Sequence, residues 1–295
     1  MRISLIDVDS KIPNLALMKI SAYHKAKGDI VNFNLRNPDR VYTSIIFTKN
    51  KGKALNQSLC DGIEFMFGGS GINLNSWLPD EIEYIKPDYD LYPSKYMLGY
   101  TSRGCNNNCY FCIVPQKEGK FKIWQHPKEF YDDRFNTVKL LDNDILWNKK
   151  WFKTVANWFL DHNVKVDMTQ GYDIRLLNED DLDLILKIKS NDPLKFAFDN
   201  TDLEQVVRRK IDIMKEMGVN TKNDVAFYCY CDNDSMHDDA VYRAELLKSL
   251  RVNADVMFNC ERKKTGRIRN LLKWSWRKQL FWSIEYNEYC KLLHT

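Results

Sequence analysis

The sequence predicts an α/β protein: an N-terminal Rossmann-like parallel sheet, then a partial (β/α)6 barrel of the TIM type, then a C-terminal helical cap. Two observations predict this architecture. Short apolar strand patterns alternate with helical patterns along most of the chain, as in βαβ units. Turns rich in Asp and Asn follow several of the later strands, where loops at the carboxyl ends of barrel strands would lie.

The first domain is expected to span residues 1–92. Pro13 precedes a segment in which apolar residues recur at helical spacing, and Gly28 ends that segment. A glycine-rich turn at 68–71 follows the last strand, and both a tight turn and a close backbone approach to a ligand remain open for it. The proline-containing segment 78–93 predicts a linker. Strands are expected at 3–8, 30–35, 41–48 and 62–67.

The second domain is expected to span residues 93–260 and to contain six β/α units. Its strands are predicted at 96–102, 137–141, 164–169, 194–198, 224–231 and 254–258, and its clearest helices at 149–161, 178–189, 202–217 and 238–250. Polar residues cluster after these strands, and each cluster alone fits a turn or a helix cap. Together they would surround one mouth of the barrel; they include Asp142, Asn143, Gln170, Asp173, Arg175 and Asp199.

Three cysteines, Cys105, Cys109 and Cys112, lie within eight residues, directly after the strand expected at 96–102. Gly104 and the three asparagines at 106–108 are poor helix formers, which argues against a buried helix face. Three thiolates on one loop can hold three irons of a [4Fe–4S] cluster and leave the fourth iron open. A structural zinc site needs four ligands and remains an alternative. Its fourth ligand would come from Cys229, Cys231, Cys260, Cys290 or His126.

The remaining cysteines allow two interpretations. Cys229 and Cys231 share one face of a strand, where they fit a packed interior. With Cys260 and Cys290 they are also enough for a second cluster. Cys231 lies at the carboxyl end of its strand, so it is the candidate catalytic residue, as a donor of a hydrogen atom.

Composition sets further limits. The 295 residues are 44% apolar, which is enough for one large or two ordinary cores, and no apolar run is long enough to span a bilayer. The N-terminus lacks a signal-peptide pattern. We therefore expect a cytoplasmic protein without a membrane partner, in which clustered thiols stay reduced. The net charge of +4 neither demands nor excludes a nucleic-acid partner.

The last domain, residues 261–295, is expected to be a basic and aromatic helix from 265 onward. Ile268, Leu271, Leu272, Trp276, Leu280 and Ile284 form an apolar stripe at helical spacing. Trp274 and Trp282 add aromatic surface beside several lysines and arginines. Such a helix either binds nucleic acid or packs on the barrel with a solvated basic face.

The cysteine loop and its surroundings resemble the radical S-adenosylmethionine (radical SAM) superfamily. The resemblance rests on three features: a strand, the Arg103-Gly104 pair after it, and the spacing Cys-x3-Cys-x2-Cys on the first loop of a six-unit barrel. Residues 101–105 and 111–119, the turn at 68–71 and the linker at 87–90 resemble the branch with an N-terminal cobalamin-binding-like domain. Residues 141–143, 170–175 and 196–199 resemble a small group within that branch.

This resemblance implies that Cys105, Cys109 and Cys112 bind a [4Fe–4S] cluster whose open iron chelates the amino and carboxylate groups of SAM. The reduced cluster would donate an electron to the sulfonium, and the resulting 5′-deoxyadenosyl radical would remove hydrogen from a substrate. Phe111 matches the aromatic position beside the adenine. A reductant such as flavodoxin or ferredoxin is implied as a partner.

The sequence also departs from the family pattern. Asp142-Asn143 stands where members carry a Gly-Gly-Glu type element that meets the SAM amino group. Polar residues at the later strand ends are the further candidates for SAM binding; they are Gln170, Asp173, Arg175 and Asp199. The Asp-x-His-x-x-Gly element that ligates cobalt is missing, so cobalamin is not expected.

The function predicted from the sequence is therefore that of a radical SAM enzyme. Its substrate class stays open, with nucleic acid or a nucleotide preferred over a peptide or a small metabolite because of the basic C-terminal segment. The alternative is a non-catalytic iron–sulfur or zinc module that binds nucleic acid.

Overall fold

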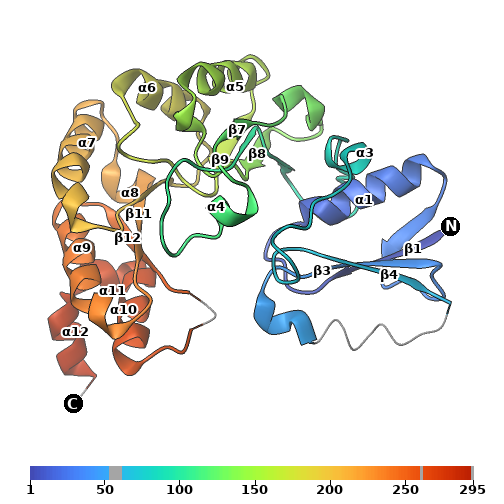
Figure 1. Ribbon diagram of the computed structural model, residues 1–295. Helices are drawn as coiled ribbons and strands as arrows, with labels where there is room; N and C mark the ends of the chain where they lie inside the picture. The colour runs from blue at the N-terminus through green and yellow to red at the C-terminus, as the bar shows by residue number, and fades with distance from the viewer. Residues whose placement is uncertain (53–61, 260–261, 294–295) are drawn as a thin grey trace. The chain divides into compact units, whose positions relative to one another are not determined.

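The protein, described by a computed structural model over residues 1–52, 62–259 and 262–293, is a mixed α/β protein with parallel sheets (Figure 1). Its backbone forms two compact units: residues 1–143 with 157–166, and residues 144–156 with 167–295. The expected boundaries at 92 and 260 stay a prediction. Cys260, named above as a candidate ligand, lies outside the described residues.

The first unit begins with a parallel sheet of strand order β2-β1-β3-β4. Ile3 and Leu5 of β1 are buried against Leu17 and Ile20 of helix α1, so one face of the sheet forms a core with this helix. The expected N-terminal parallel sheet is confirmed. Its elements are β1 (Arg2–Asp7), α1 (Leu15–Ala26), β2 (Ile30–Phe33), β3 (Arg40–Ser44), η1 (Thr48–Asn50) and β4 (Glu64–Gly68).

The glycine-rich turn after β4 packs on the protein's own backbone. Gly69 has φ +96°, and a Cβ there would lie 2.2 Å from the carbonyl oxygen of Ile45. A Cβ on Gly71 would lie 2.8 Å from the carbonyl carbon of Phe47. Both glycines are therefore explained by a close approach of the turn to the segment after β3.

The segment expected to be a linker at 78–93 is packed. It contains the short helix α3 (Asp80–Glu83). The buried Tyr89 donates its hydroxyl to the carbonyl oxygen of Phe130 at 2.8 Å. Prolines here shape a folded connection, and its role as a linker between two domains stays a prediction.

The strand expected at 96–102 is broken in two. Its first part, β5 (Met97–Gly99), pairs in parallel with β8 (Thr137–Leu140), and β9 (Lys165–Met168) continues this sheet. Its second part, β6 (Ser102–Arg103), pairs antiparallel with β7 (Lys122–Ile123). The break follows from two constraints: the ring of Phe130 packs on Gly99, and Asp142 binds the backbone of Thr101. The cysteine segment therefore closes a small hairpin between β6 and β7.

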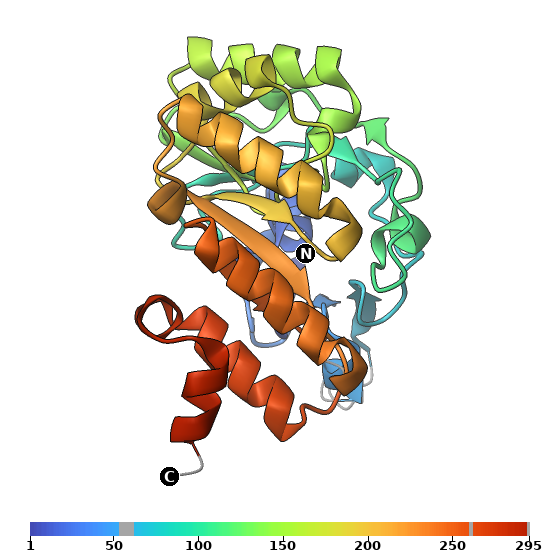
Figure 2. The same cartoon turned by 90° about the vertical axis from the view of Figure 1, so that its left-hand side faces the viewer.

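The second unit contains a parallel sheet of order β10-β11-β12. Helices α9 and α10 pack against β12, as the orange and red ribbons of Figure 2 show. The helices expected between 149 and 250 are all present. Besides β9, the elements from 145 to 257 are η3 (Ile145–Trp147), α5 (Lys149–Asp161), α6 (Glu179–Ile188), β10 (Leu194–Ala197), η4 (Thr201–Leu203), α7 (Glu204–Glu216), α8 (Thr221–Asp224), β11 (Val225–Tyr230), η5 (Asp234–Met236), α9 (His237–Ser249) and β12 (Asn253–Met257).

The C-terminal segment is helical but not one helix. It forms α10 (Gly266–Trp276), α11 (Lys278–Ser283) and α12 (Tyr286–Leu292). The breaks let the ring of Trp274 pack on Phe281 and Tyr286, at centroid distances of 4.8 and 5.4 Å. Trp274 is consequently buried and Trp276 is 53% exposed, the reverse of the predicted stripe.

Among the described residues, no helix combines the length and apolarity needed to cross a membrane.

A fully buried arginine, Arg243 on α9, ties the ends of two strands together. Its guanidinium donates to the carbonyl oxygens of Phe198 and Tyr230 at 2.5 and 3.0 Å, and to the carboxylate of Asp239 at 2.7 Å. Without it, two buried carbonyl groups would lose a donor, at a cost of about 1–3 kcal/mol each.

We predict that Arg243→Met lowers the free energy of unfolding by about 2–5 kcal/mol, measured by urea denaturation. The matched control is Arg208→Met on α7, which removes a part-exposed i,i+4 ion pair with Glu204 and should cost less than about 1 kcal/mol. Equal effects of the two substitutions would contradict this role of Arg243.

Candidate functional site

The three cysteines lie on the hairpin loop of the first unit. Cys105 and Cys112 are half-buried and Cys109 is exposed, and all three are thiols rather than disulfides. Two backbone N–H groups point at sulfur: Asn107 donates to Sγ of Cys105 and Val114 donates to Sγ of Cys112, each at 3.4 Å. Helix α4 (Val114–Lys117) follows the third cysteine and returns the chain toward β7.

Gly104 makes the tight start of this loop. Its φ is +77°, and a Cβ would lie 2.2 Å from the carbonyl oxygen of Lys120. The N–H of Cys105 donates to the carbonyl of Gly119 at 3.1 Å, so the two arms of the loop touch directly below the first cysteine. Only glycine fits this position without a backbone shift.

Glu118 joins the two arms through its carboxylate. It accepts from Nη2 of Arg103 at 2.7 Å, from the N–H of Gly104 at 2.9 Å and from Nδ2 of Asn143 at 2.8 Å. Burial alone would raise the pKa of Glu118, but these bonds and the charge of Arg103 outweigh it and hold the pKa below the ordinary value. Glu118 is therefore a carboxylate at neutral pH.

Arg103 continues this network away from the loop. Its Nη1 approaches Oε1 of Glu83 at 3.4 Å, and Glu83 also pairs with the buried Lys19 at 3.1 Å. The guanidinium lies over the rings of Trp77 and Tyr100, with its carbon 4.4 and 4.3 Å from the ring centroids. Two buried cations thus face two buried carboxylates, so each charge has a partner of opposite sign.

Asp142 fixes the strand that leads into the loop. It is fully buried at the end of β8, and its two carboxylate oxygens accept four bonds: from the N–H and hydroxyl of Thr101 at 2.8 and 2.6 Å, and from those of Ser102 at 2.6 and 2.5 Å. Burial raises the pKa of Asp142 to about 6, against the opposing effect of these hydrogen bonds. Asp142 and Asn143 thus support the base of the cysteine loop, and their predicted role in binding SAM stays a prediction.

The other predicted polar residues belong to the second unit. Gln170 and Arg175 are exposed, and Arg175 pairs with Asp173 through Nε at 2.8 Å. Asp199 is half-buried, accepts the N–H of Tyr230 at 2.7 Å, and has a pKa raised by burial. Their approach to the cysteine loop stays a prediction.

Cys231, the candidate hydrogen-atom donor, also lies in the second unit. Its side chain is fully buried, and its Sγ lies 3.8 Å from the carbonyl oxygen of Asn233. Burial raises the pKa of Cys231 to about 11, so the group is a thiol at neutral pH. A thiol, unlike a thiolate, retains the S–H hydrogen that the predicted role requires.

The loop fits a [4Fe–4S] cluster on the chemistry of its donor set. Three thiols stand on a backbone with no regular structure between Gly104 and α4, and two N–H groups already point at two of the sulfurs. Hydrogen bonds to cysteine sulfur are one of the means by which proteins set the potential of iron–sulfur clusters. Phe111 lies beside the third cysteine and contacts the ring of Tyr110 edge-on at 5.2 Å.

Within the described residues, no three His, Cys, Asp or Glu side chains form a group that could hold a single metal ion. In an iron–sulfur cluster, by contrast, each thiolate binds its own iron.

The sequence did not single out the buried charges that support the loop. Arg103 was noted only as part of a motif, and Glu118 and Glu83 had no assigned role. Their partners lie 14 to 64 positions away in the chain, as the contacts of Gly104 with Glu118 and of Lys19 with Glu83 show. The pairing of β6 with β7 and the packing of α3 on α1, which the sequence pattern did not reveal, bring them together.

Comparisons with known proteins do not identify a family. No family model and no curated protein matches this chain. A solved structure of a mutant XylFII–LytSN complex is 16% identical over 86% of this chain and 84% of its own, with a TM-score of 0.18. A likeness of that size does not establish a shared fold.

We predict that Asp142 gives the stability of the protein a measurable pH dependence. Its folded pKa of about 6 lies above the ordinary value of 3.8, so the folded state binds this proton more tightly than the unfolded state. As pH falls from 7 to 4, the wild type should gain up to about 3 kcal/mol relative to Asp142→Asn. The measurement is chemical denaturation of both proteins at pH 7 and pH 4, and a constant difference between them would contradict the raised pKa.

Proposed function

We propose that this protein is a radical SAM enzyme in which Cys105, Cys109 and Cys112 hold a [4Fe–4S] cluster. The observation that carries the proposal is the cysteine loop itself: three thiols at the spacing Cys-x3-Cys-x2-Cys, with N–H donors on two sulfurs and a buried ion-pair network beneath. When bound, the reduced cluster supplies an electron that cleaves SAM to a 5′-deoxyadenosyl radical, which takes hydrogen from the substrate.

The chain's own residues hold and shield this chemistry. Asp142 fixes the strand before the loop, and Glu118 clamps Gly104 to the returning arm. Phe111 is proposed to stack beside the adenine of SAM. Asn143, beside Glu118, is proposed to meet the polar end of SAM. The further proposed SAM ligands are Gln170, Asp173, Arg175 and Asp199, on the loops of a six-unit partial barrel.

The remaining roles follow from the same proposal. Cys231 is the proposed donor of a hydrogen atom, which its buried thiol state allows. Flavodoxin or ferredoxin would supply electrons, and a cytoplasmic location would keep the thiols reduced. Cobalamin is not proposed as a cofactor.

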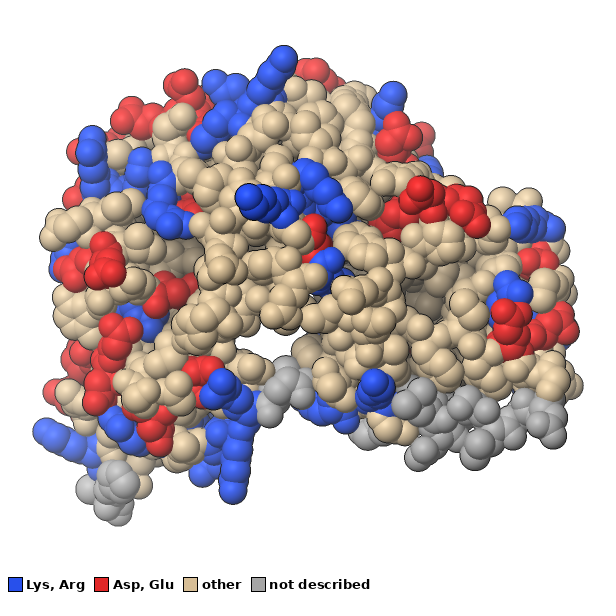
Figure 3. Space-filling view, in the orientation of Figure 1, with Lys and Arg blue, Asp and Glu red and all other residues tan. Residues whose placement is uncertain are grey.

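A nucleic acid is the proposed substrate class. The C-terminal segment carries exposed cations that form no ion pair with a carboxylate among the described residues; they include Lys263, which precedes α10, and Arg269, Lys273, Arg277 and Lys278. Trp276 stands exposed among them and offers a ring for base stacking. Figure 3 shows Lys and Arg side chains at the lower left, where this segment lies, interspersed with Asp and Glu side chains.

We predict that the anaerobically reconstituted protein contains about four irons per chain and converts SAM to 5′-deoxyadenosine and methionine after reduction. Replacing any one of Cys105, Cys109 and Cys112 with Ala should lower bound iron and abolish this product. The matched control is Cys290→Ala, a half-buried cysteine of α12, which should keep both. Zinc in place of iron, with no 5′-deoxyadenosine, would favour the alternative of a non-catalytic metal module.

We also predict that Lys273→Glu with Arg277→Glu weakens binding of single-stranded RNA. Each lost phosphate contact should reduce the slope of log K against log salt by about 0.7. The measurement is fluorescence anisotropy between 50 and 200 mM salt, with Lys187→Glu with Lys215→Glu on α6 and α7 as a control of equal charge. Identical slopes in all three proteins would remove the argument for nucleic acid.

A further inference from the structure

The first unit contains a cavity of about 780 Å3, a size typical of small-molecule sites. It opens at the carboxyl ends of β1, β3 and β4. In the strand order β2-β1-β3-β4 all strands are parallel, and the side on which successive strands are added reverses between β1 and β3. Connections on either side of such a reversal leave the sheet in opposite directions, so a crevice forms between them, and ligands of open α/β sheets bind there. The residues that follow these strands line it: Asp9, Ser10, Asn14, Ile46, Phe47, Gly69 and Ser70.

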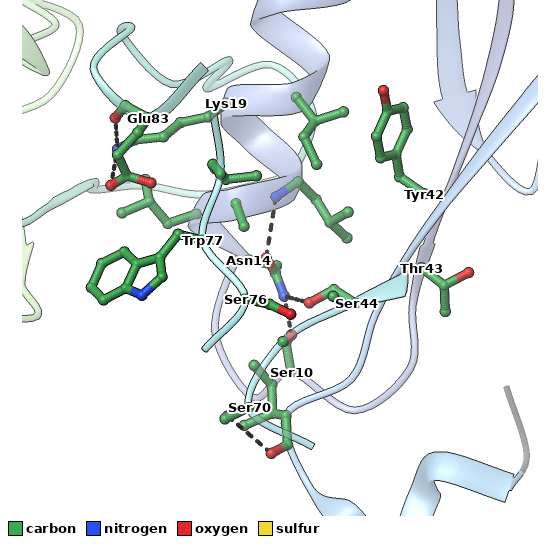
Figure 4. A pocket seen from close by; sticks show the side chains of 18 of the residues that line it. Ser10, Asn14, Lys19, Tyr42, Thr43, Ser44, Ser70, Ser76, Trp77 and Glu83 are labelled. Carbon is green, nitrogen blue, oxygen red and sulfur yellow. Dashed lines mark hydrogen bonds and ion pairs between the residues drawn. The ribbon is translucent and has the colours of Figure 1, made fainter. Parts of the chain in front are cut away.

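Two serine hydroxyls at this cavity, those of Ser10 and Ser44, each have an O–H group available to donate a hydrogen bond to a ligand. Asn14 uses its Oδ1 to accept the N–H of Leu17, and its Nδ2 donates to Oγ of Ser10 at 2.9 Å and to Oγ of Ser44 at 2.8 Å. Each serine is thereby an acceptor, and neither O–H finds an acceptor among the described residues. Ser44 is only 5% exposed, so its hydroxyl is withheld from bulk water. Figure 4 shows Asn14 between the two serines.

Unused cationic donors lie where the cavity reaches the cysteine hairpin. Nε of Arg103 is buried and has no hydrogen-bond partner within residues 1–52, 62–259 and 262–293. Lys117, half-buried on α4, has no ion-pair partner in the described part of the chain. Burial and the charge of Arg103 lower the pKa of Lys117, and the charge of Glu118 opposes this effect only in part.

The two carboxylates that line the cavity are already engaged. Asp9 accepts the N–H groups of Ile46 and Phe47 at 2.7 and 3.0 Å. Glu83 is shared between Lys19 and Arg103. The charges left to meet a ligand are therefore positive.

The walls between these polar ends are apolar and partly aromatic. Figure 4 shows Trp77 on the side of Lys19 and Glu83, with Tyr42 near the strand side. The apolar lining includes Leu15, Ile20, Tyr42, Phe47, Trp77, Leu78 and Ile82. A ligand with a flat or hydrophobic body would bury the most apolar surface between such walls, which favours its binding.

We propose that this cavity binds a small organic anion with a flat apolar body, its carboxylate or phosphate meeting Lys117 and Arg103 and its acceptor groups meeting Ser10 and Ser44. The site is distinct from the sulfurs of the cysteine loop, although Arg103 contacts both the cavity and Glu118. A ligand here would lie against the network that holds the loop.

The test uses the full chain without a cluster and two fluorescent probes that differ by one charge. 8-Anilinonaphthalene-1-sulfonate carries a sulfonate, whereas N-phenyl-1-naphthylamine has the same aromatic body and no charge. We expect saturable binding of the sulfonate to one site, about ten-fold or more weaker in Lys117→Ala, because a charge-assisted bond is lost. The neutral probe should bind both proteins equally. Lys120→Ala, an exposed lysine three positions away, is the matched control and should bind both probes like the wild type.

Competition then distinguishes the source of the negative charge. Adenosine monophosphate should displace the sulfonate probe if a phosphate is preferred, and 1-naphthoate if a carboxylate is preferred. Unsaturable probe binding, or equal sulfonate affinity in Lys117→Ala and the wild type, would overturn the proposal. Because no step requires iron or SAM, failure here leaves the proposed enzymatic function untouched, and the reverse also holds.

Discussion

Two buried carboxylates hold the base of the cysteine loop, and the shape of the candidate site depends on them. Asp142 binds Thr101 and Ser102 just before the loop, and Glu118 binds Gly104 at its first turn. Both carboxylates are desolvated, which disfavours a negative charge, but their neighbours shift the two pKa values in opposite directions. Arg103 lies beside Glu118 and lowers the pKa of that carboxylate, whereas Asp142 meets only neutral donors and its pKa is raised. The loop is thus held by one firm ion pair and by one carboxylate that can take up a proton near pH 6.

This arrangement would suit the proposed role of the loop, which is to present thiolates to a cluster. Backbone between the cysteines is irregular and can adapt to a ligand, while its two ends are fixed by β6 and β7 and by the Glu118 clamp. Binding groups positioned by a rigid frame lose less entropy when they capture a ligand. Arg103 has a second role, since it also reaches Glu83 and lines the adjacent cavity. Removing Arg103 would leave two buried carboxylates with one fewer cation, which is costly in a low-dielectric setting.

Sequence patterns were sufficient for the elements of regular structure. The parallel N-terminal strands, the helix after Pro13 and the four long helices of the later chain were expected within a few residues, because apolar periodicity and caps decide them locally. The failures were tertiary. No local sequence pattern predicts that Phe130 packs on Gly99, where the expected strand is broken. No local pattern predicts that the helix ends at Arg277, which lets Trp274 turn inward. The structural roles of Glu118 and Arg103 were missed for the same reason, because these roles depend on partners that the hairpin brings close.

In the proposed enzyme, the cysteine loop leaves one iron of a cluster open for SAM. Electron paramagnetic resonance tests it most directly. The reconstituted protein is reduced anaerobically, and its spectrum is recorded with and without SAM. Because SAM would bind the iron that has no thiolate, the account predicts that SAM shifts the g values of the reduced cluster. An iron–sulfur signal that is identical with and without SAM would contradict it.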